Sequence, residues 1–208
     1  LAIKGNTASE LYEREIYRLI DEKENCVFVP FEDKYITVIS GVSGADVDKK
    51  CRVINTLVQP YFSEKRVGES KVFPLIEIDK AIKNALLTLQ IAELKNTGYE
   101  VYDAFSVYGL LLSAKNSGAL ENFYDKFVHL IEKHDASGRM EYFSCIKAYV
   151  EWKGDYGRAA DALHQSEGTL RYRINRVKTI LGFEENTVEF NAIVSIFTAV
   201  ERILKEKK

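Results

Sequence analysis

Basic and hydrogen-bonding side chains concentrate in one short stretch, SEGTLRYRINRVKTILG, which runs from Ser166 to Gly182. Apolar residues recur in it at intervals of four, three and four, which predicts a helix with one buried face. The rest of the stretch carries arginine, lysine, asparagine, tyrosine and hydroxyl groups. Guanidinium and amide groups on a helix that fits the major groove can donate to base edges and phosphates. The residues that we expect to contact DNA are Ser166, Glu167, Thr169, Arg171, Tyr172, Arg173, Asn175, Arg176 and Lys178.

The elements before this helix have the pattern of a helix-turn-helix. Asp155 is placed to cap a short helix that contains Ala159 and Ala160, whose small side chains allow close helix packing. The tight connection HQSEG follows, and Ser166 is placed to cap the second helix. A short helix, a tight turn and a cationic second helix are typical of helix-turn-helix DNA-binding domains.

Different parts of the second helix are expected to have different roles. We predict that Arg171, Tyr172, Asn175 and Arg176 contact bases or backbone. Ser166 and Thr169, with the free amides of the first turn, are expected to hold phosphate. Arg171 and Lys178 lie along one flank and Arg173 along the other. For Tyr172 and Arg173 the pattern leaves a second role open, in which they stabilise the fold. A solvated surface helix would also carry such charges.

The bulk composition excludes several classes of protein. The chain has 208 residues with 46% hydrophobic and 29% charged residues, and its formal net charge is -2, so any DNA site must be local rather than spread over a basic surface. We find no apolar run long enough to span a bilayer and no signal peptide. Cys26, Cys51 and Cys145 are widely separated, which indicates core residues in a reducing cytoplasm. We therefore expect a cytoplasmic protein without membrane contact.

The pattern along the chain changes once. Up to about residue 115, helical and strand-like runs alternate as α-β-β-α-β-α-β, with a helix from Thr7 to Glu22, a short β-rich run at KVFPLIEI and a helix capped by Asp79. From about residue 120 only helical patterns occur. We predict an α+β domain over residues 1–115 and an all-α helix-turn-helix domain over residues 120–208.

The second half also resembles a known family. The stretch AADALHQSEGTLRYRINRVKTILG is similar to the C-terminal helix-turn-helix of PucR-type bacterial transcription regulators, which include the CdaR-type sugar-diacid regulators. Thr169 to Ile174 match the core NTLRYRL of that family, and Leu181 and Gly182 match its end. Upstream, Asp135 and Ala148 to Val150 match the lead-in. The same helices resemble Fis-type DNA-binding proteins, and both resemblances imply DNA binding.

The stretch departs from that family just before the core. Members have His-x-Asn-Thr there, whereas this chain has Ser166, Glu167, Gly168 and Thr169. A carboxylate near DNA is repelled unless it accepts from a cytosine amino group. We therefore expect a target sequence different from that of relatives, or a weakened affinity for DNA.

The first half resembles, more weakly, the degenerate GGDEF-like domain that precedes the helix-turn-helix in many PucR-type regulators. The hairpin VFVPFEDKYITVIS takes the place of the signature hairpin of diguanylate cyclases. Pro30 and Phe31 replace its glycines and add bulk where a nucleotide would lie. Glu32 and Asp33 are expected to form a solvated turn rather than to bind a metal. The domain is therefore predicted to serve in dimerisation or signal relay without enzyme activity.

These patterns together predict a non-enzymatic transcription regulator. Its expected partners are double-stranded DNA and a second copy of the chain, because helix-turn-helix proteins usually bind paired half-sites as dimers. An effector-sensing domain, if there is one, is expected before residue 1, and we expect no cofactor or metal. Two alternatives stay open. The cationic helix binds an acidic protein partner in one, and residues 1–115 turn over a nucleotide in the other.

Overall fold

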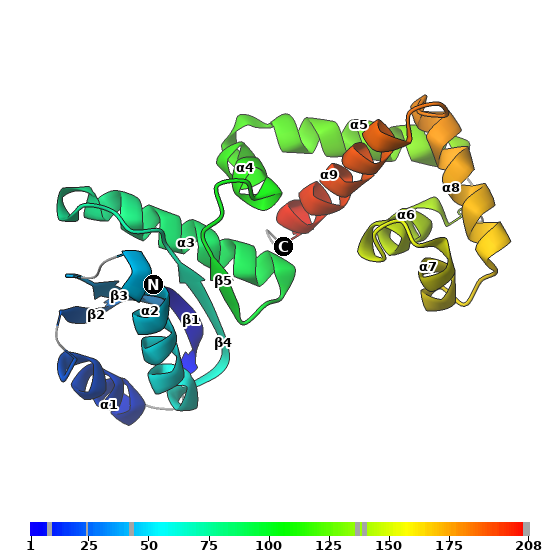
Figure 1. Ribbon diagram of the computed structural model, residues 1–208. Coiled ribbons are helices and arrows are strands. Elements are labelled where there is room, and N and C mark those ends of the chain that lie inside the picture. Colours follow the sequence, from blue (N-terminus) through cyan, green and yellow to red (C-terminus); the bar gives the residue numbers. More distant parts are fainter. Residues whose placement is uncertain (8–9, 24, 42–43, 136–137, 139–140, 206–208) are drawn as a thin grey trace. The chain divides into compact units, whose positions relative to one another are not determined.

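The computed structural model describes residues 1–7, 10–23, 25–41, 44–135, 138 and 141–205. The chain divides into two compact units, Leu1–Gly109 and Leu110–Lys208 (Figure 1). The first unit combines a sheet with helices, and the described part of the second contains helices and no strand. The predicted fold class, an α+β region followed by an all-α helix-turn-helix region, is confirmed.

A five-stranded sheet organises the first unit, with the strands in the order β2-β3-β1-β4-β5. Neighbouring strands are antiparallel except for β4 and β5, which are parallel. The strands are β1 (Ala2–Thr7), β2 (Cys26–Phe31), β3 (Lys34–Ile39), β4 (Phe62–Glu69) and β5 (Tyr99–Val101). From β1 to β4 the elements follow one another as β-α-β-β-α-β, which is the ferredoxin-like arrangement.

Helices cover both faces of this sheet (Figure 1). Helices α1 (Glu10–Asp21) and α2 (Gly44–Val58) pack Ile16, Ile20 and Ile54 against Ile3 and other residues of one face. Helix α3 (Ile78–Lys95) packs on the other face. Two short 3₁₀ helices, η1 (Gln59–Tyr61) and η2 (Leu75–Glu77), flank β4.

The backbone of α3 lies unusually close to β4 at Gly68. A Cβ atom at this position would lie 2.2 Å from the amide nitrogen of Leu89 and 2.4 Å from the carbonyl oxygen of Ala85. Glycine is therefore required here by space, because any side chain would push the helix off the sheet.

Three local predictions for the first unit were wrong. The segment from Ala2 to Thr7 is a strand, β1, and the helix after it begins at Glu10 rather than Thr7; residues 8 and 9 of that predicted helix lie outside the described residues. The run KVFPLIEI forms no strand and contains η2 instead. Asp79 lies in the first turn of α3, and the residue at its N-cap is Glu77, without a side-chain cap.

The second unit packs its helices around an aromatic core. The helices are α4 (Val107–Ser113), within which the division between the units falls, η3 (Lys115–Ser117), α5 (Ala119–His134), α6 (Tyr142–Glu151), α7 (Tyr156–Ala162), α8 (Glu167–Leu181) and α9 (Thr187–Lys205). Phe127 of α5 stacks on Phe197 of α9 with ring centroids 4.0 Å apart. Residues 206–208 of the predicted all-α domain lie outside the described residues.

Several absences can be stated for the described residues. No helix among them is long and apolar enough to cross a membrane. No three histidine, cysteine, aspartate or glutamate side chains within the described ranges are grouped so as to hold a metal ion. Cys51 and Cys145 are buried, as predicted for core residues, whereas Cys26 is half-buried, and all three are free thiols.

Candidate nucleic-acid interface

Helices α7 and α8 are joined by a tight turn whose backbone is closed by hydrogen bonds. At the start of α7, the Asp155 carboxylate accepts from the amide of Arg158 at 3.1 Å, as predicted for an N-cap. At its end, the amide of His164 donates to the carbonyl of Asp161, and the amide of Gln165 donates to that of Ala160 at 3.0 Å. This pair of bonds reverses the chain and places His164 in the left-handed region, with φ at +53°.

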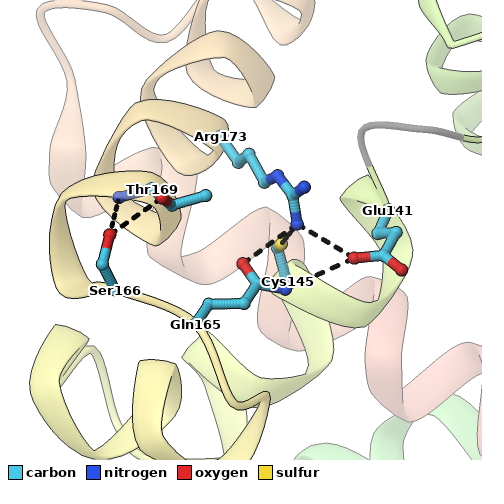
Figure 2. Close-up of polar contacts among 6 residues, drawn as sticks. All are labelled: Glu141, Cys145, Gln165, Ser166, Thr169 and Arg173. Atoms are coloured by element: carbon cyan, nitrogen blue, oxygen red, sulfur yellow. Dashed lines mark hydrogen bonds and ion pairs between the residues drawn. The ribbon is translucent and has the colours of Figure 1, made fainter.

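Helix α8 is capped at both ends. The Ser166 hydroxyl accepts from the amide of Thr169 at 3.1 Å and lies 2.8 Å from the Thr169 hydroxyl (Figure 2). The predicted serine cap is therefore confirmed. At the other end, Gly182 adopts φ +76°, and the amide of Phe183 donates to the carbonyl of Lys178 at 2.8 Å. Both caps fix the limits of the helix at Glu167 and Leu181.

The apolar stripe of α8 faces the core of the second unit. Leu170, Ile174 and Val177 are fully buried, in a cluster that includes Ala159 and Ala160 of α7. The last residue of the stripe, Leu181, is only half-buried. Because the small alanines of α7 belong to the same cluster, the two helices pack closely, as the sequence predicts.

The opposite face of α8 is open to solvent. Tyr172 is 59% exposed, and Asn175 and Arg176 are exposed beside it. Within the described part of the chain, the side chains of these three residues take part in no hydrogen bond or ion pair. Their donors and acceptors are therefore free to meet a partner.

Arg171 occupies a different environment at the start of the same helix. Its Nη2 donates to Oε1 of Glu167 at 2.6 Å, one helical turn earlier, and its guanidinium lies 4.3 Å from the ring centroid of Tyr156 in α7. The hydrogen bond with Glu167 raises the pKa of Arg171. Arg171 is still about half exposed, so it is oriented by its neighbours without being withdrawn from solvent.

Arg173 lies on the inner flank and connects three elements (Figure 2). Its Nη1 donates to Glu141 at 3.0 Å, at the start of α6, and to Gln165 in the turn at 2.9 Å. The same nitrogen lies 3.9 Å from Sγ of Cys145. With only 16% of its side chain exposed, Arg173 holds the turn and α8 against α6. Burial in this cluster raises the pKa of the Cys145 thiol.

Lys178 lies on the flank near the C-terminal end of α8. Its Nζ donates to the Thr187 hydroxyl at 3.1 Å and lies 5.3 Å from the ring centroid of Phe190. The nitrogen thus lies beside the start of α9.

Sequence patterns did not identify three residues that orient the arginines. Tyr156, Glu141 and Gln165 are separated in sequence from the arginines that they contact, so helical periodicity carries no signal for them. The Glu167–Arg171 pair differs, because its four-residue spacing brings two opposite charges together on any helix.

The caps, the closed turn, the buried inner stripe and the cationic outer face define a helix-turn-helix. Comparison with known families assigns it more closely, because residues 142–198 match the PucR C-terminal helix-turn-helix domain. This confirms the predicted PucR-type resemblance for the second unit. The second unit therefore carries the DNA-binding domain of a transcription regulator.

Two other comparisons are with curated proteins and with solved structures. No curated protein is significantly similar to the chain. Among solved structures, the crystal structure of the regulator of polyketide synthase expression from Bifidobacterium adolescentis matches with 18% sequence identity and a TM-score of 0.36, over 98% of this chain and 84% of that one. Identity and TM-score at this level do not establish a shared function.

Proposed function

We propose that the chain binds specific DNA sequences by inserting α8 into the major groove. The observation that carries the proposal is the outer face of α8, where Tyr172, Asn175 and Arg176 are exposed and have no polar partner within the described residues. Arginine can donate to guanine, and asparagine can pair with adenine through two hydrogen bonds. Tyr172 contacts the backbone or a base from the same face.

The N-terminal turn of α8 is proposed to hold a phosphate. The first amides of a helix have no partner within it, and Ser166 satisfies only that of Thr169. The amides of Glu167 and Gly168 therefore remain for an anion, and the Ser166 and Thr169 hydroxyls add donors beside them. Lys178 is proposed to contact phosphate from the other end of the helix.

Arg173 receives a different role in this proposal. Its donors already bond Glu141 and Gln165, so we assign it to orienting α8 and not to contacting bases. Arg171 is kept among the DNA-contacting residues, because its bond to Glu167 leaves other N–H groups exposed.

The two compact units are proposed to be a degenerate GGDEF-like domain and the DNA-binding domain. The first assignment is supported by the hairpin of β2 and β3, whose tip is Glu32 and Asp33. Asp33 pairs with Lys34 and, at 3.3 Å, with Lys4. A carboxylate matched in this way is a poor metal ligand, so the unit is proposed to dimerise or relay a signal in the cytoplasm without turning over a nucleotide.

The first test is salt-dependent binding. Fluorescence anisotropy would follow a random-sequence duplex pool with the purified chain at about 50 and 200 mM salt, where several phosphate contacts should lower the affinity about tenfold or more. The variant Arg171→Ala/Arg176→Ala should bind much less. Lack of binding by the wild-type chain at the lower salt would contradict the proposal and favour an acidic protein partner for α8.

A further inference from the structure

The start of α8 carries an acidic residue where DNA binding by charge alone would disfavour one. Glu167 is the first residue of the helix and is about half exposed. Its carboxylate lies over the beginning of α7, with Oε2 3.9 Å from the point where a Cβ of Gly157 would lie. Neither neighbouring glycine, Gly157 nor Gly168, has a side chain that would cover it.

The structure fixes the direction of this carboxylate. Oε1 accepts from Arg171 at 2.6 Å, and the guanidinium of Arg171 is held in turn over the ring of Tyr156 at 4.3 Å. Within the described residues Oε2 has no hydrogen-bond partner, so it is left to accept from a ligand. Glu167 and Arg171 therefore present an acceptor and a donor side by side on one exposed face, already oriented before any partner arrives.

An acceptor beside a donor matches one base pair in one orientation. In the major groove, cytosine presents an amino donor, and the guanine paired with it presents two acceptors. A carboxylate over cytosine and a guanidinium over guanine are both satisfied, whereas the reversed pair places the carboxylate against the acceptors of guanine and the guanidinium against the amino donor of cytosine. An anion at this place is repelled by phosphate, so it acts against every site that lacks the matching donor.

We propose that Glu167 and Arg171 together select one C·G base pair in each half-site, with Glu167 accepting from cytosine and Arg171 donating to guanine. The inference rests on the proposed function, because it requires α8 to lie in the major groove. It makes Glu167 a specificity-determining residue whose presence lowers the affinity for DNA in general. Arg171 then has two partners, Glu167 and guanine, while Tyr156 keeps its guanidinium in position.

The experiment begins with selection of a preferred duplex from a random pool by the wild-type chain. Competition anisotropy then measures all four base pairs at each half-site position. The wild-type chain should favour C·G over the reversed G·C about tenfold or more at one position. The variant Glu167→Gln should lose that preference in favour of A·T, because glutamine pairs with adenine, and should bind unselected duplexes more tightly than the wild type.

Two further variants separate the possible causes. Glu184→Gln removes the same charge from an exposed residue of the turn after α8, and it should leave the preference at every position unchanged. Arg171→Lys keeps the positive charge but loses the planar fork, so it should weaken discrimination at the same base pair and nowhere else. Far-UV circular dichroism of each variant checks that α8 still forms, and Arg171→Lys decides the question if Glu167→Gln does not fold.

The outcomes distinguish the inference from the function on which it rests. If the wild-type chain binds duplexes with a steep salt dependence but Glu167→Gln keeps the same preference at every position, the inference is overturned while the proposed function stands. If Glu184→Gln changes the preference as Glu167→Gln does, the effect is one of net charge, and the inference is again overturned. If the wild-type chain binds no duplex, both fail together.

Discussion

The hairpin of β2 and β3 and the outer face of α8 are both exposed and charged, but they differ in what their charges meet. At the hairpin tip, Asp33 is matched by Lys34 and Lys4, and the hydrogen bond from Lys34 lowers the pKa of Asp33. On α8, Arg176 has no acidic partner within the described residues. Charges satisfied inside the protein serve its own structure, whereas charges left unmatched beside a rigid scaffold are available to a partner.

The same contrast occurs within α8 itself. Arg173 and Arg176 are one turn apart, yet one is bonded to Glu141 and Gln165 and the other extends into solvent. Residue type and spacing therefore do not decide the role of an arginine on this helix. The role is decided by the environment of the guanidinium, which depends on residues of α6 and of the turn before α8.

The largest loss of stability is expected from a substitution at Gly68, where β4 packs against α3. In Gly68→Ala the new methyl group would lie 2.2 Å from a backbone atom that cannot give way without moving the helix. We expect the free energy of unfolding to fall by about 3 kcal/mol or more. Urea denaturation followed by far-UV circular dichroism measures it.

A matched glycine and a local probe make this test specific. Gly98→Ala should change stability little, because its Cβ would lie no nearer than 3.9 Å to the closest atom. The only tryptophan of the chain, Trp152, lies in the second unit, so its fluorescence follows that unit separately. An unchanged denaturation midpoint for Gly68→Ala would show that the contact between α3 and β4 is not as close as described.

The sequence predicts α7 and α8 well because the local signals agree there. Asp155 and Ser166 cap their helices, and Leu170, Ile174 and Val177 form the buried stripe, so periodicity and capping indicate the same boundaries. The strand β1 escaped detection because LAIKGNT is short and its apolar residues, Leu1, Ala2 and Ile3, are adjacent, so no alternation marks it. Its strand conformation is stabilised by pairing with β3 and β4, which are distant in the sequence.

The candidate site shows the same division between local and distant information. The exposed face of α8 follows from the helical period, so Tyr172, Asn175 and Arg176 could be placed from the sequence. The position of Arg173 could not, because it depends on Glu141, which is 32 residues away. Local patterns therefore identify which surface is exposed, and tertiary contacts decide which of its charges are free.

A smaller loss of stability should distinguish a substitution of Arg173 from one of Arg176. Arg173→Met removes the bonds to Glu141 and Gln165, and we expect the free energy of unfolding to fall by about 1–2 kcal/mol because hydrogen bonds of a charged donor are lost. Arg176→Met should leave stability within about 0.5 kcal/mol of the wild type, because the side chain is exposed. Thermal unfolding compares the two variants.

The affinity for duplex DNA should distinguish Arg173→Met from Arg176→Met in a different way from their stability. Arg176→Met loses a direct contact, so its affinity should fall although its fold is intact, whereas Arg173→Met weakens binding only through the position of α8. Lowering the temperature should restore part of the binding of Arg173→Met and none of that of Arg176→Met. Equal losses of stability in both variants would remove the distinction between an orienting and a contacting arginine.

The smallest effect is expected at the cap of α8, where Ser166 has two roles in the proposal. In Ser166→Ala the amide of Thr169 loses its acceptor, which should cost about 1 kcal/mol of stability. Ser166→Asp restores an N-cap acceptor and should keep the stability of the wild type. It also places a negative charge beside the amides of Glu167 and Gly168, where a phosphate is proposed to bind. Ser166→Asp should therefore bind duplex DNA less tightly than Ser166→Ala, although it is the more stable of the two. If the affinity followed stability instead, Ser166 would act only as a cap, and the phosphate would lie elsewhere on α8.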